Sequence, residues 1–206
     1  ATRMLVSELA GKASLVAKAR SLGIELGNYP ETTQQILDEV KQREAQGYSY
    51  EVADGSLAIL LLRHLGRYKP HFTLESFRVI VDDREDTGAL AKDAMSEATI
   101  KIHVGDKRFV ATGEGAGPVE ALDVALRMAI GEFFPEVEQM ELVDFKVRIL
   151  DENVGTGAIT RVLITTSDGA ALWGTVGVSE NIIEASWNAL VDSIEYGLAR
   201  RELSLR

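Results

Sequence analysis

The spacing of hydrophobic residues changes along the chain and divides it into two parts. Up to about residue 68, apolar side chains recur every three or four positions, as on one face of a helix. From residue 72 onward they alternate with polar side chains, as in strands that bury one face. We therefore expect helices over residues 1–68, a boundary near residues 68–71, and a second domain over residues 72–206.

Three short helices separated by glycines are expected in the first part, and together they are typical of a jointed connector. Glycines and prolines mark helix ends, whereas threonine can cap a helix start through its side-chain oxygen. The expected boundaries are a first helix between Gly11 and Gly23, a second after Pro30 with Thr32 or Thr33 as its cap, and a third from about Asp54 or Ser56 to Leu65.

The second part contains the same pattern twice. Residues 77–81 and 145–149 share an aromatic residue, a following basic residue and the same apolar alternation. A duplicated unit tends to pack about a pseudo-twofold axis, with a seam between its copies. The helices that follow also correspond, with one constant offset: Gly113, Glu120, Ala121, Ala125, Leu126 and Ile130 match Gly177, Glu184, Ala185, Ala189, Leu190 and Ile194.

Each copy is predicted to form three antiparallel strands followed by one helix, so the fold class is α+β with a duplicated βββα domain. A three-stranded sheet needs a helix or another sheet against one face to be stable. In the first copy we expect strands at 74–81, 98–104 and 108–112 and a helix from Pro118, with a buried stripe that ends at Phe133. In the second copy we expect strands at 142–150, 159–166 and 172–176 and a helix at about 180–200.

Composition narrows the classes of function. Asp and Glu number 32 against 22 Lys and Arg, so the chain would repel nucleic acid on average. The longest apolar run, residues 57–62, is far shorter than the roughly 20 residues that span a bilayer, and no secretion signal opens the chain. Cysteine is absent, which fits a reducing compartment. We expect a cytoplasmic protein that binds neither nucleic acid nor membrane, and the start at Ala1 suggests a fragment of a longer polypeptide.

Catalytic and metal-binding motifs are not found. The three histidines have no carboxylate or second histidine at ligand spacing, and no nucleophile-base pair is present. We therefore predict no catalytic residue and no metal ligand. His103 is expected to face solvent, and Trp173 and Trp187 are expected to fill core or interface volume.

A glycine-rich turn over residues 113–118 joins a strand to a helix, which is the setting of phosphate-binding turns. No parallel βαβ pattern or P-loop lysine accompanies it, so dinucleotide binding is not favoured. The first-turn amides of the two helices can instead hold a carboxylate, while Glu120, Glu180 or Glu184 can hold an ammonium group. A zwitterionic amino acid has both groups. The alternative, that these glycines only shape a sharp turn, is equally compatible with the sequence.

Three segments carry a resemblance to a known family. Residues 113–121 match the glycine-rich start of its first regulatory helix, and residues 179–186 match the start of its second. Residues 7–14 resemble the segment that leaves the catalytic barrel, in the form typical of citramalate-type members. The whole chain is thus similar to the C-terminal portion of the isopropylmalate synthase and citramalate synthase family.

The resemblance implies a regulatory role rather than catalysis. In that family an acyltransferase barrel condenses acetyl-CoA with a 2-oxo acid using a divalent metal, and the C-terminal domain dimerises and binds the end product. The barrel motifs are missing here, so this fragment is expected to hold no cofactor of its own. The implied effector is a branched-chain amino acid, with isoleucine favoured and leucine possible. The implied effector residues are Gly117, Pro118, Val119, Glu120, Val143, Val147, Ser179, Glu180, Asn181 and Ile182.

Two other interpretations stay open. In the first, the repeat only forms a homodimer of the parent enzyme and binds no ligand. In the second, the chain is an autonomous nucleotide-binding enzyme. The sequence does not choose between isoleucine and leucine, because a one-methyl difference in shape is worth only about 1 to 3 kcal/mol.

Overall fold

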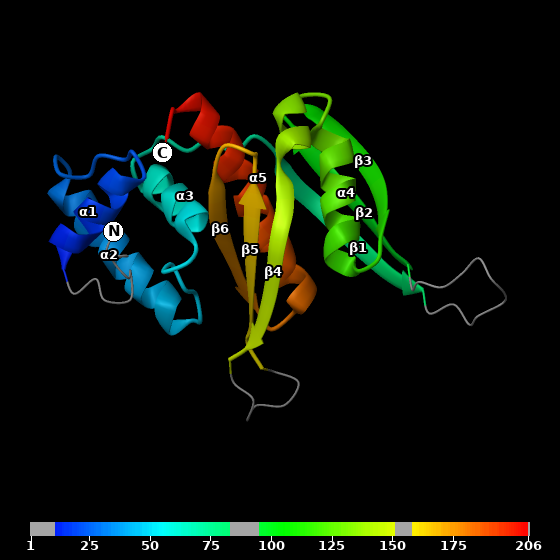
Figure 1. Ribbon diagram of the computed structural model, residues 1–206, viewed down its shortest axis with the longest axis horizontal. Helices are drawn as coiled ribbons and strands as arrows, with labels where there is room; N and C mark the ends of the chain where they lie inside the picture. The colour runs from blue at the N-terminus through cyan, green and yellow to red at the C-terminus, as the bar shows by residue number, and fades with distance from the viewer. Residues whose placement is uncertain (1–10, 83–94, 151–157, 206) are drawn as a thin grey trace. The chain divides into compact units, whose positions relative to one another are not determined.

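The computed structural model describes residues 11–82, 95–150 and 158–205 (Figure 1). Two compact units are distinguished along the chain. The first-copy unit is Pro70–Glu138, and the second-copy unit combines Ala1–Lys69 with Gln139–Arg206. Helices and antiparallel sheets occur together, which confirms the α+β class. The N-terminal helices thus share a unit with the second copy, and the expected division into 1–68 and 72–206 stays a prediction.

The first-copy unit is a three-stranded antiparallel sheet with one helix. Its strands are β1 (Thr73–Asp82), β2 (Met95–Val104) and β3 (Lys107–Gly115), in the order β1-β2-β3. Helix α4 (Pro118–Ile130) packs mainly on β3 and β2. Its buried side chains are Ala121, Leu122, Ala125, Leu126, Ala129 and Ile130, while Phe133 lies beyond the end of the helix and packs edge-on against Phe109.

The second-copy unit repeats this arrangement. Strands β4 (Glu141–Ile149), β5 (Thr160–Ser167) and β6 (Leu172–Ser179) form a sheet in the order β4-β5-β6. Helix α5 (Ile182–Glu202) packs on β6 and β5 and lies behind the sheet in Figure 1. A 3₁₀ turn that the sequence did not predict, η2 (Pro135–Gln139), precedes β4.

The two copies also share local details, which confirms the duplication at the level of single residues. In each copy the pairing of the first two strands is interrupted by a bulge, between Leu74 and Ser76 in one and Leu142 and Asp144 in the other. A strand glycine in each copy lets the helix approach so closely that a Cβ would overlap helix backbone atoms. These contacts are Gly113 with Ala121 and Ala125, and Gly177 with Ala185 and Ala189.

The N-terminal helices are α1 (Lys12–Ser21), α2 (Pro30–Ala45) and α3 (Asp54–His64). Helix α3 packs on both α5 and β6, and its residues 55–62 are buried. The hydroxyl of Ser56 accepts a hydrogen bond from the Val176 amide at 3.0 Å. Because an unpaired strand edge attracts other chains, this contact protects the free side of β6. Helix α3 is therefore part of the core of the second-copy unit.

One predicted helix cap is wrong. Helix α2 begins at Pro30 with Tyr29 as its N-cap, so neither Thr32 nor Thr33 caps it. Proline fits the first helical position because it has no amide to leave unsatisfied. The Thr33 hydroxyl instead donates to the Tyr29 carbonyl oxygen at 2.7 Å, inside the first turn.

Both tryptophans are buried, as predicted, with 4% of each exposed. The indole nitrogen of Trp173 donates to the Ser193 carbonyl oxygen at 3.0 Å, which joins β6 to α5. His103 is partly exposed and bonds to Glu75 at 3.1 Å. The Trp173 contact therefore helps to hold α5 against the second sheet.

Candidate functional site

The start of α4 is an uncapped helix terminus. Gly117 occupies the N-cap position and has no side chain to accept a hydrogen bond, and Pro118 follows as the first helical residue. The amides of Val119 and Glu120 therefore receive no side-chain cap. A Cβ built on Gly117 meets no atom within 4 Å. This end of α4 thus offers open amides and the positive end of the helix dipole to an anion.

The glycines of the turn before α4 have different roles. A Cβ on Gly115 would lie 2.7 Å from the Ala121 amide nitrogen and 2.8 Å from the Glu120 Cβ, so packing requires glycine there. The Glu120 carboxylate turns back and accepts a hydrogen bond from the Ala116 amide at 2.9 Å. Gly113 and Gly115 lie at the end of β3 and are required by the close approach of α4, whereas no contact requires glycine at position 117.

The start of α5 is closed by its own side chains. Oδ1 of Asn181 accepts from the amides of Ile183 at 2.8 Å and Glu184 at 3.4 Å. The Ser179 hydroxyl donates to the Glu184 carboxylate at 2.7 Å and accepts from the Asn181 amide at 3.1 Å. Glu180 and Ile182 are exposed beside this cap. The two predicted helix starts therefore differ, because asparagine caps one and glycine leaves the other open.

Val143 and Val147 lie on β4, away from the start of α5. Val143 sits at the bulge and is 50% exposed, and Val147 pairs with Val162 and is 38% exposed. Strand β5 separates β4 from β6, which ends at Ser179. The structure thus groups residues 117–120 at one helix start and residues 179–182 at the other, and it places the two valines on a third element.

A polar cluster between α3 and α5 was not predicted from the sequence. The Ser56 hydroxyl donates to Oδ2 of Asp192 at 2.7 Å. Burial raises the pKa of Asp192 to about 6, against the opposing effects of this hydrogen bond and of the Arg63 and Arg43 charges. Burial also raises the pKa of Tyr68, which the nearby Glu195 raises further. In the sequence Asp192 and Glu195 share a polar helix face with Asn188, and nothing in that pattern indicates that α3 packs there.

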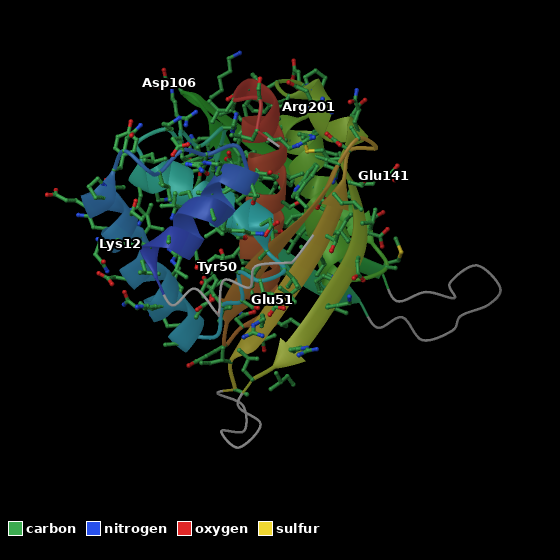
Figure 2. All side chains as sticks on the ribbon, turned by 60° about the vertical axis from the view of Figure 1, so that its left-hand side comes forward. Lys12, Tyr50, Glu51, Asp106, Glu141 and Arg201 are labelled. Carbon is green, nitrogen blue, oxygen red and sulfur yellow. The ribbon has the colours of Figure 1, made fainter. Side chains whose placement is uncertain are left out.

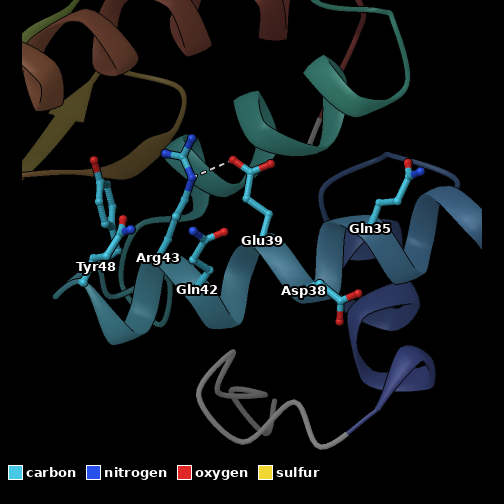
Figure 3. A pocket seen from close by; sticks show the side chains of 7 residues that line it. Gln35, Asp38, Glu39, Gln42, Arg43 and Tyr48 are labelled. Atoms are coloured by element: carbon cyan, nitrogen blue, oxygen red, sulfur yellow. Dashed lines mark hydrogen bonds and ion pairs between the residues drawn. The ribbon is translucent and has the colours of Figure 1, made fainter.

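Two cavities adjoin this cluster. One, of about 300 Å³, is lined by Arg43, Tyr48, Arg63, Val176, Trp187, Asn188, Val191 and Asp192. The other, of about 600 Å³, runs along α2 (Figure 3) and is lined by Gln35, Asp38, Glu39, Gln42, Arg43, Gln46 and Tyr48. Nε of Arg43 donates to Oε1 of Glu39 at 2.7 Å, so the cation of the α2 groove is already paired. The groove therefore offers no unpaired cation to an anionic ligand, while the exposed carboxylate of Asp38 remains in its lining.

Within residues 11–82, 95–150 and 158–205, no three His, Asp or Glu side chains gather as metal ligands. None of the helices in those ranges has the length and apolar character to cross a bilayer.

Comparison with known proteins identifies the family. Residues 51–198 match the LeuA allosteric (dimerisation) domain. The (R)-citramalate synthase of Streptomyces coelicolor is 50% identical over 199 residues, which cover 96% of this chain and 36% of that protein. The (R)-citramalate synthase of Aquifex aeolicus is 43% identical over 97% of this chain and 37% of its own length.

More distant relatives extend the same pattern. The 2-isopropylmalate synthase of Aquifex aeolicus is 24% identical over 98% of this chain and 35% of its own length. This chain therefore spans a little over a third of the relatives that it matches. It belongs to the LeuA allosteric (dimerisation) domain family, in agreement with its resemblance to the regulatory region of isopropylmalate and citramalate synthases.

Proposed function

We propose that this chain is the regulatory part of an acetyl-CoA-dependent synthase that condenses a 2-oxo acid, with citramalate favoured over isopropylmalate as the product. It binds a branched-chain amino acid end product, with isoleucine favoured, and so mediates feedback inhibition. The observation that carries the proposal is the match to an allosteric domain family, with citramalate synthases as similar relatives along nearly the whole chain. The condensation itself, with its divalent metal, belongs to the rest of that enzyme.

The open start of α4 supports amino-acid binding. The effector's carboxylate accepts hydrogen bonds from the amides of Val119 and Glu120, where the helix dipole also favours negative charge. A dissociation constant of 1 mM corresponds to about 4 kcal/mol. Two charge-assisted hydrogen bonds of about 1.5 to 3 kcal/mol each supply that amount before the apolar side chain is buried. The self-capped start of α5 is less suited to a carboxylate, since Asn181 already occupies its amides.

Inhibition requires a difference in affinity between two states. An effector that binds one arrangement 10 to 100 times more tightly shifts the equilibrium by about 1.4 to 2.8 kcal/mol. Helix α3 is suited to transmit such a shift, because it contacts both α5 and β6 and leads back toward α2. A change in the packing of the second copy would therefore act on α3, and the effector at α4 must first alter the second copy for this route to operate.

We also propose a homodimer, which the description of the family supports. The helix-side face of β4 provides apolar surface for an interface, since α5 packs on β5 and β6. Phe145 is 36% exposed and Ile149 is 58% exposed on that face. If the chain has only a structural role, it will form this dimer and bind no amino acid. Sedimentation equilibrium with and without isoleucine separates the dimer from the sensing role.

The sensing role is tested by calorimetric titration of isoleucine, leucine and valine into the protein and into Gly117→Asp. The backbone at position 117 has φ −151° and ψ 170°, which any residue adopts, and a side chain has free space there. An aspartate cap would occupy the amides of α4 and compete with the effector carboxylate. We expect affinity for isoleucine to fall at least about tenfold, the equivalent of one lost charge-assisted hydrogen bond.

The matched control is Asn181→Asp, which adds the same negative charge at a helix start that is already capped. We expect this variant to bind isoleucine like the unmodified chain. Equal binding by Gly117→Asp would remove the α4 site from the proposal. No saturable heat for any of the three amino acids at millimolar concentration would leave the purely structural role.

A further inference from the structure

A cluster of cations occupies the face of the second sheet that is turned away from α5. Arg148 on β4 and Arg161 on β5 are directly paired across the two strands, and Lys146 lies two residues along on the same face. With Ser49 and Glu51, from the segment between α2 and α3, they line a recess of about 330 Å³. In Figure 2 Tyr50 and Glu51 are labelled between the N-terminal helices and the second sheet.

Of the three positively charged side chains in this recess, only Lys146 forms an ion pair with another described residue. Lys146 forms an ion pair with Asp144 at 2.8 Å. Nε of Arg161 donates to the Gly47 carbonyl oxygen, which orients the guanidinium but does not neutralise it. Arg148 has no ion pair or hydrogen bond to any other described residue. Partial burial, followed by repulsion from Arg148, lowers the pKa of Arg161. The carboxylates of Glu51 and Asp144 also line the recess, but neither guanidinium group forms an ion pair with another described residue.

The duplicated fold does not require this pair of arginines. At the equivalent register of the first copy, Ile80 pairs with Glu97 across β1 and β2. Like charges directly opposite each other on a sheet are destabilising, and the chain as a whole carries a net charge of −10. The arginine pair thus lowers local stability, although the net negative charge of the chain attracts cations in general. A ligand that neutralises both guanidinium groups would account for it.

We propose that this recess binds an oxyanion, namely the phosphate or carboxylate group of a small anionic ligand. Guanidinium groups suit such a ligand because their planar forks donate two parallel hydrogen bonds to one group. The recess is within the size range of small-molecule sites. It lies in the second-copy unit, whereas the effector site proposed above lies at the start of α4. The two proposals are therefore independent, and either can fail without the other.

The test uses inorganic phosphate as the probe, with sodium chloride at matched ionic strength as the reference. Thermal unfolding and ¹H–¹⁵N spectra of the arginine Nε groups are recorded for the chain during titration up to about 20 mM phosphate. We expect saturable shifts of the Arg148 and Arg161 signals and a higher Tm in phosphate than in chloride. A parallel titration with citrate distinguishes a carboxylate ligand from a phosphate ligand.

Arg148→Gln is the informative variant because Arg148 is exposed and has no described partner that its loss would disturb. Losing one charge-assisted contact should weaken phosphate binding about tenfold. Arg108→Gln is the matched control, since it removes the same charge from the first copy, where Arg108 is paired with Glu75 at 2.6 Å. This control should bind phosphate normally. Equal binding by Arg148→Gln, or no effect of phosphate or citrate beyond that of chloride, would overturn the proposal.

Discussion

Replacing Asp192 by asparagine should stabilise the second-copy unit at neutral pH. Its carboxylate lies between α5 and α3, where Arg63 and Arg43 lower its pKa and Glu195 raises it. Burial raises its pKa from the usual 3.8 to about 6, because the charged form loses hydration that the arginines do not fully replace. Asparagine keeps an oxygen that can accept the Ser56 hydrogen bond and removes the charge.

The sign and size of the effect follow from proton linkage. The folded state binds the Asp192 proton more tightly than the unfolded state, so the contribution of this group to stability is greatest below pH 3.8. That contribution falls as the pH rises and is lost above about pH 6. A difference of about two pKa units corresponds to at most about 3 kcal/mol. We therefore expect Asp192→Asn to gain about 1 to 3 kcal/mol at pH 7.5 and little below pH 4.

The assay is urea unfolding at several pH values between 4 and 8, followed by tryptophan fluorescence, since Trp173 and Trp187 both lie in this unit. Asp38→Asn is the matched control because Asp38 is exposed on α2. It should leave the pH dependence unchanged. If Asp192→Asn is less stable than the unmodified chain at pH 7.5, the arginines stabilise the charged form and the reasoning is refuted.

Two further predictions concern packing. Gly113→Ala and Gly177→Ala should each destabilise their unit by about 3 kcal/mol, because the new methyl group overlaps helix backbone. Gly117→Ala should cost at most about 1 kcal/mol, because a side chain at position 117 meets no other atom. Equal effects at all three positions in urea unfolding would contradict the shared packing of the copies. Ser56→Ala should cost about 1 to 3 kcal/mol because it leaves the Val176 amide unpaired. Faster hydrogen exchange at Val176 is the expected signature, and unchanged exchange would show that α3 does not protect the edge.

Local patterning was sufficient to predict the repeated elements. Alternating apolar and polar residues indicate the buried face of a strand, and a stripe of small residues indicates the buried face of a helix. Both copies carry these patterns at matching positions. Gly113 and Gly177 correspond in the sequence and also in the structure, because the backbone of the following helix packs directly against each of them. The cap of α2 was mispredicted because two threonines follow a proline, and spacing alone does not reveal which residue begins the turn.

Features that depend on long-range contacts were not predictable. Nothing local to Ser56 indicates that it bonds to Val176 and Asp192, which lie 120 and 136 positions away. The facing arginines on β4 and β5 likewise appear only when the strand register is known. The ten predicted effector residues include the starts of two helices, which differ in the structure. The start of α4 has no side-chain cap, whereas Asn181 caps the start of α5. That difference was present in the sequence, as glycine at position 117 and asparagine at position 181.

The most direct measurement of the central claim is a ¹H–¹⁵N titration of the chain with isoleucine. We predict saturable shifts that are largest at the amides of Gly117, Val119 and Glu120, smaller effects of leucine and valine, and loss of the shifts in Gly117→Asp. Spectra that stay unchanged with all three amino acids at millimolar concentration would contradict the claim that this allosteric domain senses a branched-chain amino acid.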